Sequence, residues 1–398
     1  MSRYIFLIVL LLTAGCGPSK DEGQVPRDTG AGKEKPARDV YADFKPTPEQ
    51  YPIPESVLKV TRTDIKKAKY PAVDIHFHGR DWADAEKQLA LMDELGVAMI
   101  ANMDGYFGER LETAMRNAAS SNGRLINFAR VDWEGIDDPD WPERAAADLA
   151  ESYRVGAAAL KISKNLGMSL KYADGRYVMP DDPRLDRIWE TCARSGLPVM
   201  IHTADPPARW QPIGPNNERY EAGMWRSSPD GNYYGSDLPH YTELLAAQER
   251  LYARHPNTIF IGAHVTSRGW DLAEVSRLLD TYPNLYVDMN ARLQELGRQP
   301  YTARRFFLKY QDRILFGTDG NPTREADFWI PHWRFLETDD EYFNHPAQMR
   351  GPLGAGLQGR WMIYGVFLPD GVLRKIYYAN ALKLLPDRVR DRYQSLYQ

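Results

Sequence analysis

Cysteine, histidine and net charge are all scarce in this chain of 398 residues, which has two cysteines, eight histidines and a formal net charge of −4. So few cysteines exclude a disulfide-rich scaffold and any zinc cluster built on cysteine. The near balance of charge argues against a protein that binds nucleic acid through its whole surface. A charged fraction of 26% excludes a polytopic membrane protein, and a hydrophobic fraction of 43% suffices for a real core.

The N-terminal segment is predicted to lie outside the fold. Residues 1–15 combine a short cationic start, a brief apolar run and small residues directly before Cys16, a pattern typical of a secretory signal. It resembles a bacterial lipoprotein signal, which implies that Cys16 carries a lipid. The protein would then sit in the cell envelope, on the periplasmic side or the cell surface, and touch the membrane through this anchor only. An ordinary signal peptide with an incidental cysteine is the alternative.

Residues 16–45 are rich in Gly, Pro, Lys and Asp and nearly free of aliphatic residues. Such a segment buries too little apolar surface to order itself, so it predicts a flexible tether. Cys192 is then the only thiol of the mature chain, and its helical context predicts a buried side chain.

The rest of the chain, residues 46–398, alternates short apolar runs with amphipathic stretches. Length alone would allow two or three domains of about 150 residues, or one barrel of roughly 250 residues with long loops. Leu89, Met92 and Leu95 share one helical face that ends at Gly96. Eight runs are too short for helices and predict strands, at residues 72–75, 97–101, 125–129, 157–160, 198–201, 258–262, 284–288 and 313–316.

Eight strand–helix repeats predict one α/β domain, a (β/α)8 TIM barrel with a closed parallel sheet. A doubly wound open sheet is the alternative, but no glycine-rich phosphate turn follows the first run. The surplus length lies in two long loops at 206–240 and 320–370.

Half of the eight histidines follow predicted strands. His76 and His78 lie two residues apart where the first strand ends, so both side chains point the same way. His202, His264 and Asp319 end the fifth, sixth and eighth strands. Because barrel enzymes place their chemistry at the C-terminal ends of the strands, these five residues predict one metal or catalytic site.

These motifs resemble the amidohydrolase superfamily. Within it, they are similar to the amidohydrolase-related branch of aminocarboxymuconate-semialdehyde decarboxylase, resorcylate-type decarboxylases and pyrone-dicarboxylate lactonase. The resemblance extends from about residue 70 to 385 and rests on HxH (76–78), IHTADP (201–206), GAHVTS (262–267), FGTDG (316–320) and LRKIYYANALKLL (373–385).

The resemblance implies that His76, His78, His202 and Asp319 bind a divalent metal and that His264 acts as an acid or base. Asp319 also has a catalytic role, since one oxygen would bind the metal and the other accept a proton. A shell of neutral histidines and a carboxylate suits Zn²⁺, with Mn²⁺ possible. Such an ion would lower the pKa of its water towards about 7 and polarise a substrate carbonyl.

Lys161 follows the fourth predicted strand. In dinuclear members of the superfamily, a carboxylated lysine at this place bridges two metals. In the branch that this chain resembles, the site is usually mononuclear, and we favour one ion. A cation that binds a substrate carboxylate is the third role open to Lys161.

Further strand ends carry polar side chains. They would either recognise polar groups of the substrate, or play structural roles by capping helices and pairing with neighbouring charges. They are Arg80, Asn102, Asp104, Arg130 and Asn290.

Both long loops contain aromatic residues, which suit a ring-shaped or sugar-like ligand if they are exposed. If they pack on each other, they form a lid or a subunit interface, and a homodimer becomes possible. The residues are Trp210, Trp225, Tyr233 and Tyr234 in the first loop and Trp329, His332, Trp333, His345 and Trp361 in the second.

We expect a metal-dependent hydrolase that acts on a small ester, lactone or amide and needs no nucleic-acid partner. The first alternative is non-oxidative decarboxylation of a small carboxylated ring or enoate, in which Arg80 or Arg130 would hold the carboxylate. The second is a non-catalytic surface protein that binds a ligand through its aromatic loops.

Overall fold

The computed structural model describes residues 56–212, 214, 216–219, 232–321, 328–345 and 361–397, all within one compact unit, Arg38–Gln398. The predicted signal, Cys16 and the tether lie outside these residues, so the lipid anchor and the location in the cell envelope stay predictions. No helix of the described part is long and apolar enough to cross a membrane.

Parallel strands form one sheet, in which each strand pairs with the next one along the chain. The eight strands are β1 (Ala72–Phe77), β2 (Val97–Tyr106), β3 (Leu125–Ala129), β4 (Leu160–Ile162), β5 (Val199–Ile201), β6 (Phe260–Gly262), β7 (Leu285–Asp288) and β8 (Ile314–Leu315). β1 also bonds to the segment that follows β8. The Ile75 amide donates to the Phe316 carbonyl at 3.2 Å, and the Asp319 amide donates to the His76 carbonyl at 2.7 Å. These bonds bring the two edges of the sheet together and confirm the predicted (β/α)8 barrel.

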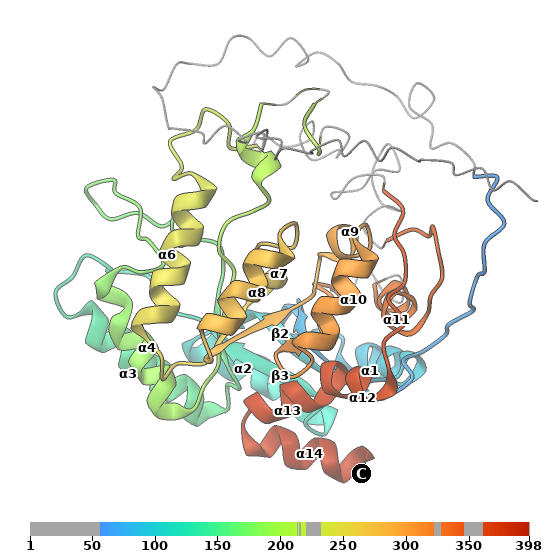
Figure 1. The fold of residues 1–398 in the computed structure, drawn as a ribbon. Coiled ribbons are helices and arrows are strands. Elements are labelled where there is room, and N and C mark those ends of the chain that lie inside the picture. The colour runs from blue at the N-terminus through green and yellow to red at the C-terminus, as the bar shows by residue number, and fades with distance from the viewer. Residues whose placement is uncertain are drawn as a thin grey trace, which may run out of the picture. The chain divides into compact units, whose positions relative to one another are not determined.

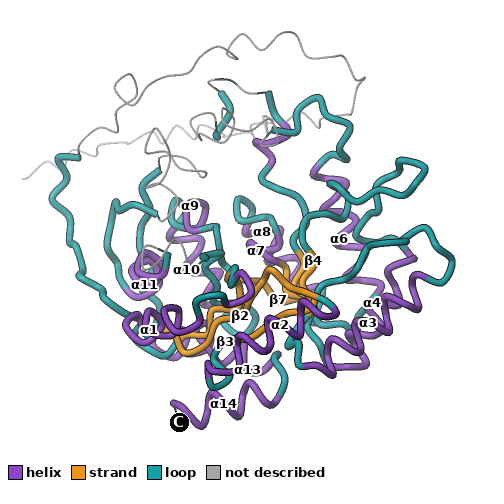
Figure 2. The backbone as a smooth tube through the Cα atoms, turned by 180° about the vertical axis from the view of Figure 1, so that it is seen from behind, coloured by secondary structure: helices purple, strands orange, loops and turns teal. Residues whose placement is uncertain are grey.

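Helices lie outside the strands, which occupy the centre of this unit (Figures 1 and 2). The α-helices are α1 (Ala85–Leu95), α2 (Gly108–Ala118), α3 (Trp141–Val155), α4 (Asp186–Ser195), α6 (Tyr241–Arg254), α7 (Ala263–Thr266), α8 (Leu272–Thr281), α9 (Leu293–Leu296), α10 (Pro300–Lys309), α11 (Trp329–Glu337), α12 (Asp370–Arg374), α13 (Asn380–Leu384) and α14 (Asp387–Tyr397). Short 3-10 turns are η1 (Arg80–Trp82), η2 (Ala119–Ser121), η3 (Pro183–Leu185) and η4 (Pro207–Trp210).

Local sequence signals explain much of this arrangement. α1 ends where predicted, at Gly96, whose φ of 76° suits glycine because this residue has no Cβ. Cys192 lies buried in α4, as expected. The fourth strand forms as predicted but lies further along the chain, from Leu160 to Ile162 and not over residues 157–160. The preceding alanines already bond to β3, and the Ala158 amide donates to the Asn127 carbonyl at 2.9 Å.

One end of the barrel is closed by the C-terminal helices. Leu385 and Val389 belong to the same apolar cluster as the barrel residues Val73 and Met200. The Tyr393 hydroxyl donates to the Pro71 carbonyl directly before β1, at 2.8 Å. The N-terminal ends of the strands are therefore covered by an apolar layer, and the polar residues gather at the opposite end.

The predicted closing segment 373–385 is helical, with a π-helical turn (η7, Lys375–Ala379) between α12 and α13. A π turn loosens the regular α-helical hydrogen bonds. Here the Ile376 carbonyl accepts a hydrogen bond from the Phe316 amide at 3.0 Å. This contact ties the helix to the strand that leads to Asp319.

Candidate metal centre

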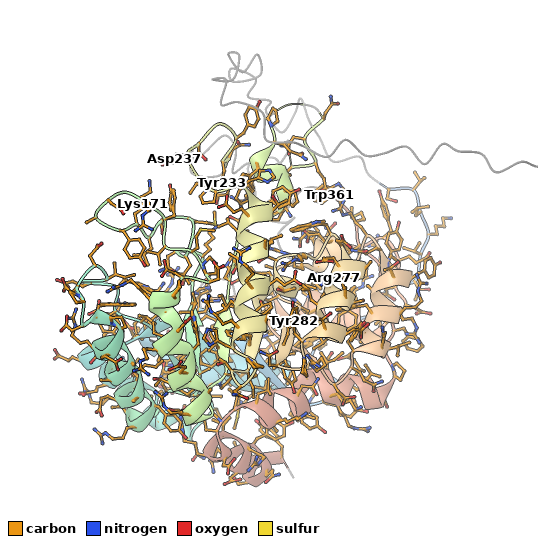
Figure 3. The ribbon with its side chains drawn as sticks, turned by 60° about the vertical axis from the view of Figure 1, so that its left-hand side comes forward. Lys171, Tyr233, Asp237, Arg277, Tyr282 and Trp361 are labelled. Atoms are coloured by element: carbon orange, nitrogen blue, oxygen red, sulfur yellow. The ribbon has the colours of Figure 1, made fainter. Side chains whose placement is uncertain are left out.

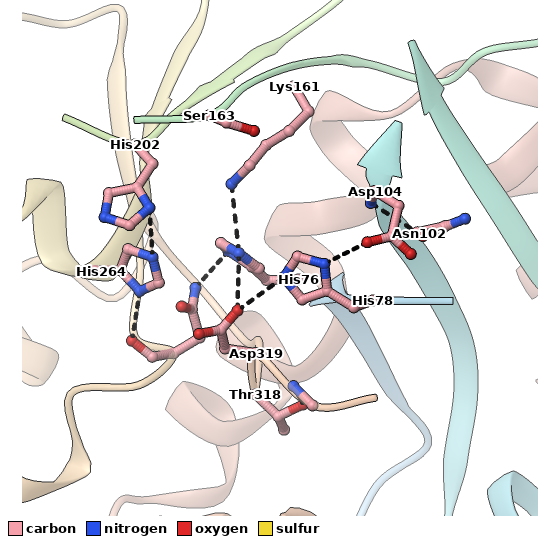
Figure 4. Close-up of polar contacts among 12 residues, drawn as sticks. His76, His78, Asn102, Asp104, Lys161, Ser163, His202, His264, Thr318 and Asp319 are labelled. Atoms are coloured by element: carbon pink, nitrogen blue, oxygen red, sulfur yellow. Dashed lines mark hydrogen bonds and ion pairs between the residues drawn. The ribbon is translucent and has the colours of Figure 1, made fainter. Parts of the chain in front are cut away.

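His76, His78 and Asp319 come together at the C-terminal ends of β1 and β8. Each offers one ligand atom, and these three atoms lie within 4.8 Å of one another. Asp319 Oδ1 is 3.4 Å from His76 Nε2 and 3.2 Å from His78 Nε2 (Figure 4). The close approach of the two strands needs a glycine at 317, since a Cβ there would lie 2.9 Å from the Cβ of His76.

Two carboxylates fix the outer nitrogens of these histidines. His76 Nδ1 lies 2.8 Å from Asp288 Oδ2, and His78 Nδ1 lies 2.6 Å from Asp104 Oδ1. A carboxylate accepts hydrogen bonds, so each Nδ1 carries the hydrogen. When the ring is neutral, its Nε2 is then free to bind a metal, and the Nε2 atoms of both histidines face the same Asp319 oxygen.

Lone pairs that face one another need a positive charge between them. Ligands about 2.1 Å from a tetrahedral ion lie roughly 3.4 Å apart, which agrees with the separations of 3.2 and 3.4 Å. Carboxylate partners on the outer nitrogens are the usual support of metal-binding histidines. The three residues therefore fit a divalent metal by chemistry and by spacing.

The protonation of the cluster follows from its charges. Burial would raise the pKa of Asp319, but the hydrogen bond to His78 and the histidine charges hold it far below its usual value. Burial would lower the pKa of His78, yet hydrogen bonds to Asp104 and Asp319 raise it to about 9. Burial, together with the Lys161 charge, lowers the pKa of His76. Without a metal, His78 is thus the member of the cluster that holds a proton.

His202 and His264 form a second pair beside this cluster. His264 Nε2 lies 3.2 Å from His202 Nδ1, and His264 Nδ1 lies 3.2 Å from the Asn290 carbonyl oxygen. Because that oxygen only accepts, His264 Nδ1 donates, and His202 Nδ1 donates in turn to His264 Nε2. His202 Nε2 is left unprotonated, buried and without a hydrogen bond in the described structure.

The structure brings three of the four predicted ligands into one cluster and places the fourth, His202, against His264. Its role as a ligand stays a prediction. Burial holds the pKa of His202 and that of His264 well below the ordinary value. Both rings are therefore neutral, as a ligand or a proton acceptor must be.

The single turn α7, which carries His264, is strained and departs from regular helical geometry at His264 and Val265. Four successive residues, His264 to Ser267, have φ between 49° and 59°, and Val265 is β-branched. Such residues avoid this region unless other contacts hold them there. Asp288 supplies one such contact, since its Oδ1 accepts from the His264 amide at 2.6 Å while its Oδ2 holds His76. One buried carboxylate thus positions residues of both histidine pairs.

The remaining candidates take different places. Lys161 is buried, and its Nζ lies 3.4 Å from His76 Nε2; burial lowers the pKa of this lysine to about 8. Asn290 is buried, and its side-chain amide lies 2.7 Å from His76 Nδ1. Arg130 donates to Ser163 Oγ at 2.8 Å. Arg80 has an exposed side chain, and its backbone amide donates to Asp104 at 2.7 Å.

Two buried aspartates have roles that the sequence did not reveal, Asp288 and Asp74. Asp74 accepts four hydrogen bonds, from the His76 amide, the Thr318 amide and hydroxyl, and the Trp329 indole, at 2.6 to 3.2 Å. It thereby ties β1 to the turn that carries Asp319 and to α11. Two features of the sequence could have pointed to these roles: Asp74 lies two residues before the HxH motif, and Asp288 ends the strand LYVD.

Of the aromatic residues singled out in the two long loops, Tyr234 is exposed and the other described ones are buried or half-buried. Trp329, His332 and Trp333 are buried in α11, so they pack into the core and exposure was the wrong alternative for them. In the other loop the hydroxyl of Tyr233, which Figure 3 labels, donates to Asp205 Oδ2 at 2.7 Å. The centre of the Tyr233 ring lies 4.7 Å from that of Trp210, and the two rings are tilted by 59°. Trp225 lies outside the described residues.

No curated protein sequence matches the chain. Solved structures with a similar fold include 2,6-dihydroxybenzoate decarboxylase from Rhizobium, which is 16% identical and has a TM-score of 0.44, over 79% of this chain and 98% of that one. A dihydroxybenzoic acid decarboxylase from a Polaromonas species, with bound manganese and the inhibitor 2-nitroresorcinol, is 16% identical over 79% of this chain and 96% of that one, with a TM-score of 0.49.

A probable 2-pyrone-4,6-dicarboxylic acid hydrolase from Acinetobacter baumannii, with citric acid bound, is 12% identical over 62% of this chain and 83% of that one, with a TM-score of 0.38. At these identities the solved structures add no assignment of activity. The sequence itself matches the family model described as amidohydrolase over residues 73–386, most of the chain. The chain therefore belongs to the amidohydrolase family.

Proposed function

We propose that the protein is a divalent-metal-dependent hydrolase of a small ester, lactone or amide. The observation that carries this proposal is the convergence of His76 Nε2 and His78 Nε2 on Asp319 Oδ1, with a carboxylate beside the Nδ1 of each histidine. His76, His78 and Asp319 would hold the ion, with His202 as a further ligand. Zn²⁺ suits this set best, and Mn²⁺ is the alternative. The bound ion supplies a Lewis acid for the substrate carbonyl and makes a neighbouring water more acidic.

The chain's own residues supply the proton transfers. Asp319 is ionised, and its Oδ2 makes no hydrogen bond among the described residues. This oxygen is free to take a proton from an attacking water. His264 is held by the Asn290 carbonyl through Nδ1, so its Nε2 side faces His202 and the site. We assign to His264 the orientation of the reacting groups and the relay of this same proton, which its unprotonated Nε2 would take from Asp319 and pass to the leaving group.

Lys161 favours a second candidate, non-oxidative decarboxylation. A buried ammonium group next to His76 is suited to hold a substrate carboxylate beside the metal. In this reaction the same site would bind a carboxylated ring or enoate, and a proton would replace the lost carboxyl group.

Product analysis decides between the two reactions. Purified protein is stripped with a chelator, reloaded with Zn²⁺ or Mn²⁺, and given ester, lactone, amide and carboxylated-ring substrates in ¹⁸O-water. Hydrolysis predicts metal-dependent incorporation of ¹⁸O into the product. Release of CO₂ without incorporation of ¹⁸O would contradict hydrolysis and support decarboxylation. A protein that binds no metal and turns over no substrate would refute both and leave a ligand-binding protein.

A further inference from the structure

Arg292 follows β7 and is buried, with only 3% of its surface exposed. Its guanidinium makes one hydrogen bond, from Nη1 to the neighbouring Ala291 carbonyl at 2.6 Å. Nε is buried without a partner. No carboxylate among the described residues lies within 4.0 Å of this guanidinium, and the nearby Glu295 pairs instead with Arg219 at 2.5 Å.

Arg268 shows what a structural arginine looks like in the same region. It is equally buried, at 4% exposure. Its Nη1 donates to the Gln248 side chain and to the Thr266 carbonyl and hydroxyl, and its Nη2 donates to the Leu245 carbonyl, at 2.6 to 3.2 Å. Among the described residues, Arg268 therefore has protein acceptors on both of its Nη atoms, whereas Arg292 has one on Nη1 alone.

A buried charge without a partner destabilises the folded protein. Proteins keep such a group where a ligand supplies the missing partner. Arg292 also lies two residues after Asn290, whose carbonyl oxygen is 3.2 Å from His264 Nδ1. After burial and other charges, the positive charge of Arg292 contributes to lowering the pKa of His202 and that of His264. Its aliphatic stem passes over Gly269, where an added Cβ would lie 3.1 Å from Arg292 Cδ. A glycine at position 269 therefore leaves room for the aliphatic part of the Arg292 side chain.

We propose that Arg292 binds a carboxylate group of the substrate through its Nε and Nη2 atoms. With Nη1 used by Ala291, the Nε–Nη2 edge remains, and this edge matches the two oxygens of a carboxylate. The inference rests on the proposed function only in that the substrate occupies the site beside His202 and His264. It narrows the substrate class to small esters, lactones or amides that carry a carboxylate.

The test compares benzoate with benzamide, which has the same shape but no charge. Each is titrated into the metal-loaded full chain, and affinity is derived from the shift in melting temperature and from calorimetry. Benzoate should bind and benzamide should not. Arg292→Met should weaken benzoate binding about 10- to 100-fold. Arg292→Lys keeps the positive charge but loses the pair of parallel N–H donors, so it should also weaken benzoate binding about tenfold.

Arg268→Met is the matched control, since it removes a buried arginine of structural character. It should lower the melting temperature but leave benzoate affinity unchanged, whereas Arg292→Met should not lower the melting temperature. Benzoate binding that is absent in the wild type, or unchanged in both Arg292 variants, overturns the proposal. Tighter binding of inorganic phosphate than of benzoate overturns the carboxylate assignment. Metal content is measured in parallel, so a failure of the metal site is seen separately.

Discussion

The two histidine pairs at the mouth of the barrel differ in what holds them. His76 and His78 each have a carboxylate on the outer nitrogen, and both direct Nε2 at Asp319. His202 and His264 bond to each other, and their chain of donors ends at the backbone carbonyl of Asn290. The first pair is built to face a cation. The rings of the second pair are neutral and make no hydrogen bond to a carboxylate of the described residues, which suits proton transfer. Because no such carboxylate fixes the His202 ring, this ring could also turn to bind the metal.

Of the changes considered, Asp319→Asn should have the largest effect, because it should remove the ability of the first histidine pair to bind a cation. The change removes the negative charge on which both β1 histidines converge. We expect loss of bound metal beyond the 10- to 100-fold weakening typical of supporting residues, with turnover at background. Metal analysis by mass spectrometry and a kinetic assay measure the two effects. A variant with full metal and full activity would show that Asp319 has neither role.

His264→Ala separates the two pairs. If the site holds one ion at the first pair, the variant should keep its metal and lose turnover about 10²- to 10⁴-fold, the range for an acid–base group. The matched change His78→Ala should lose metal. Loss of part of the metal from the His264 variant would instead favour a dinuclear site, with Lys161 as the bridging residue.

Asp288→Asn and Asp104→Asn should have smaller effects, since they alter partners of the ligands. We expect metal affinity to fall about 10- to 100-fold for Asp288→Asn. The drop should be smaller for Asp104→Asn, because the Asp104 and His78 side chains are 24% and 39% exposed and water replaces part of the lost interaction. Competition with a metal indicator gives both affinities. Equal affinities in the wild type and the Asp288 variant would contradict the role of this carboxylate.

The barrel and the meeting of His76, His78 and Asp319 could be predicted from sequence because both depend on short patterns. Because these three residues lie at or just after the C-terminal ends of strands in a parallel barrel, they share the same end of the barrel for any conformation of the loops. The supporting contacts could not be predicted, because His76 and Asp288 are 212 positions apart and only the closed sheet brings them together. The placement of His202 against His264, the burial of Trp329 and Trp333, and the unpaired state of Arg292 depend likewise on side-chain packing across loops.

The pH dependence of metal binding is the mildest test of the comparison. In the metal-free protein, hydrogen bonds raise the pKa of His78 from 6.5 to about 9, so a proton competes with the metal there. Metal affinity should therefore rise with pH, by up to about tenfold per unit, and level off near pH 9. The stability that the protonated histidine gives the metal-free protein is present below pH 6.5 and lost as the pH rises through about 9. An affinity that does not change with pH would exclude this proton.

Metal stoichiometry tests the central claim most directly. The purified protein, stripped and then reloaded with Zn²⁺ or Mn²⁺, should retain about one equivalent per chain, and a His76→Ala, His78→Ala double variant should retain none. Less than about half an equivalent in the wild type, with no recovery on adding either metal, would contradict a metal centre at these residues.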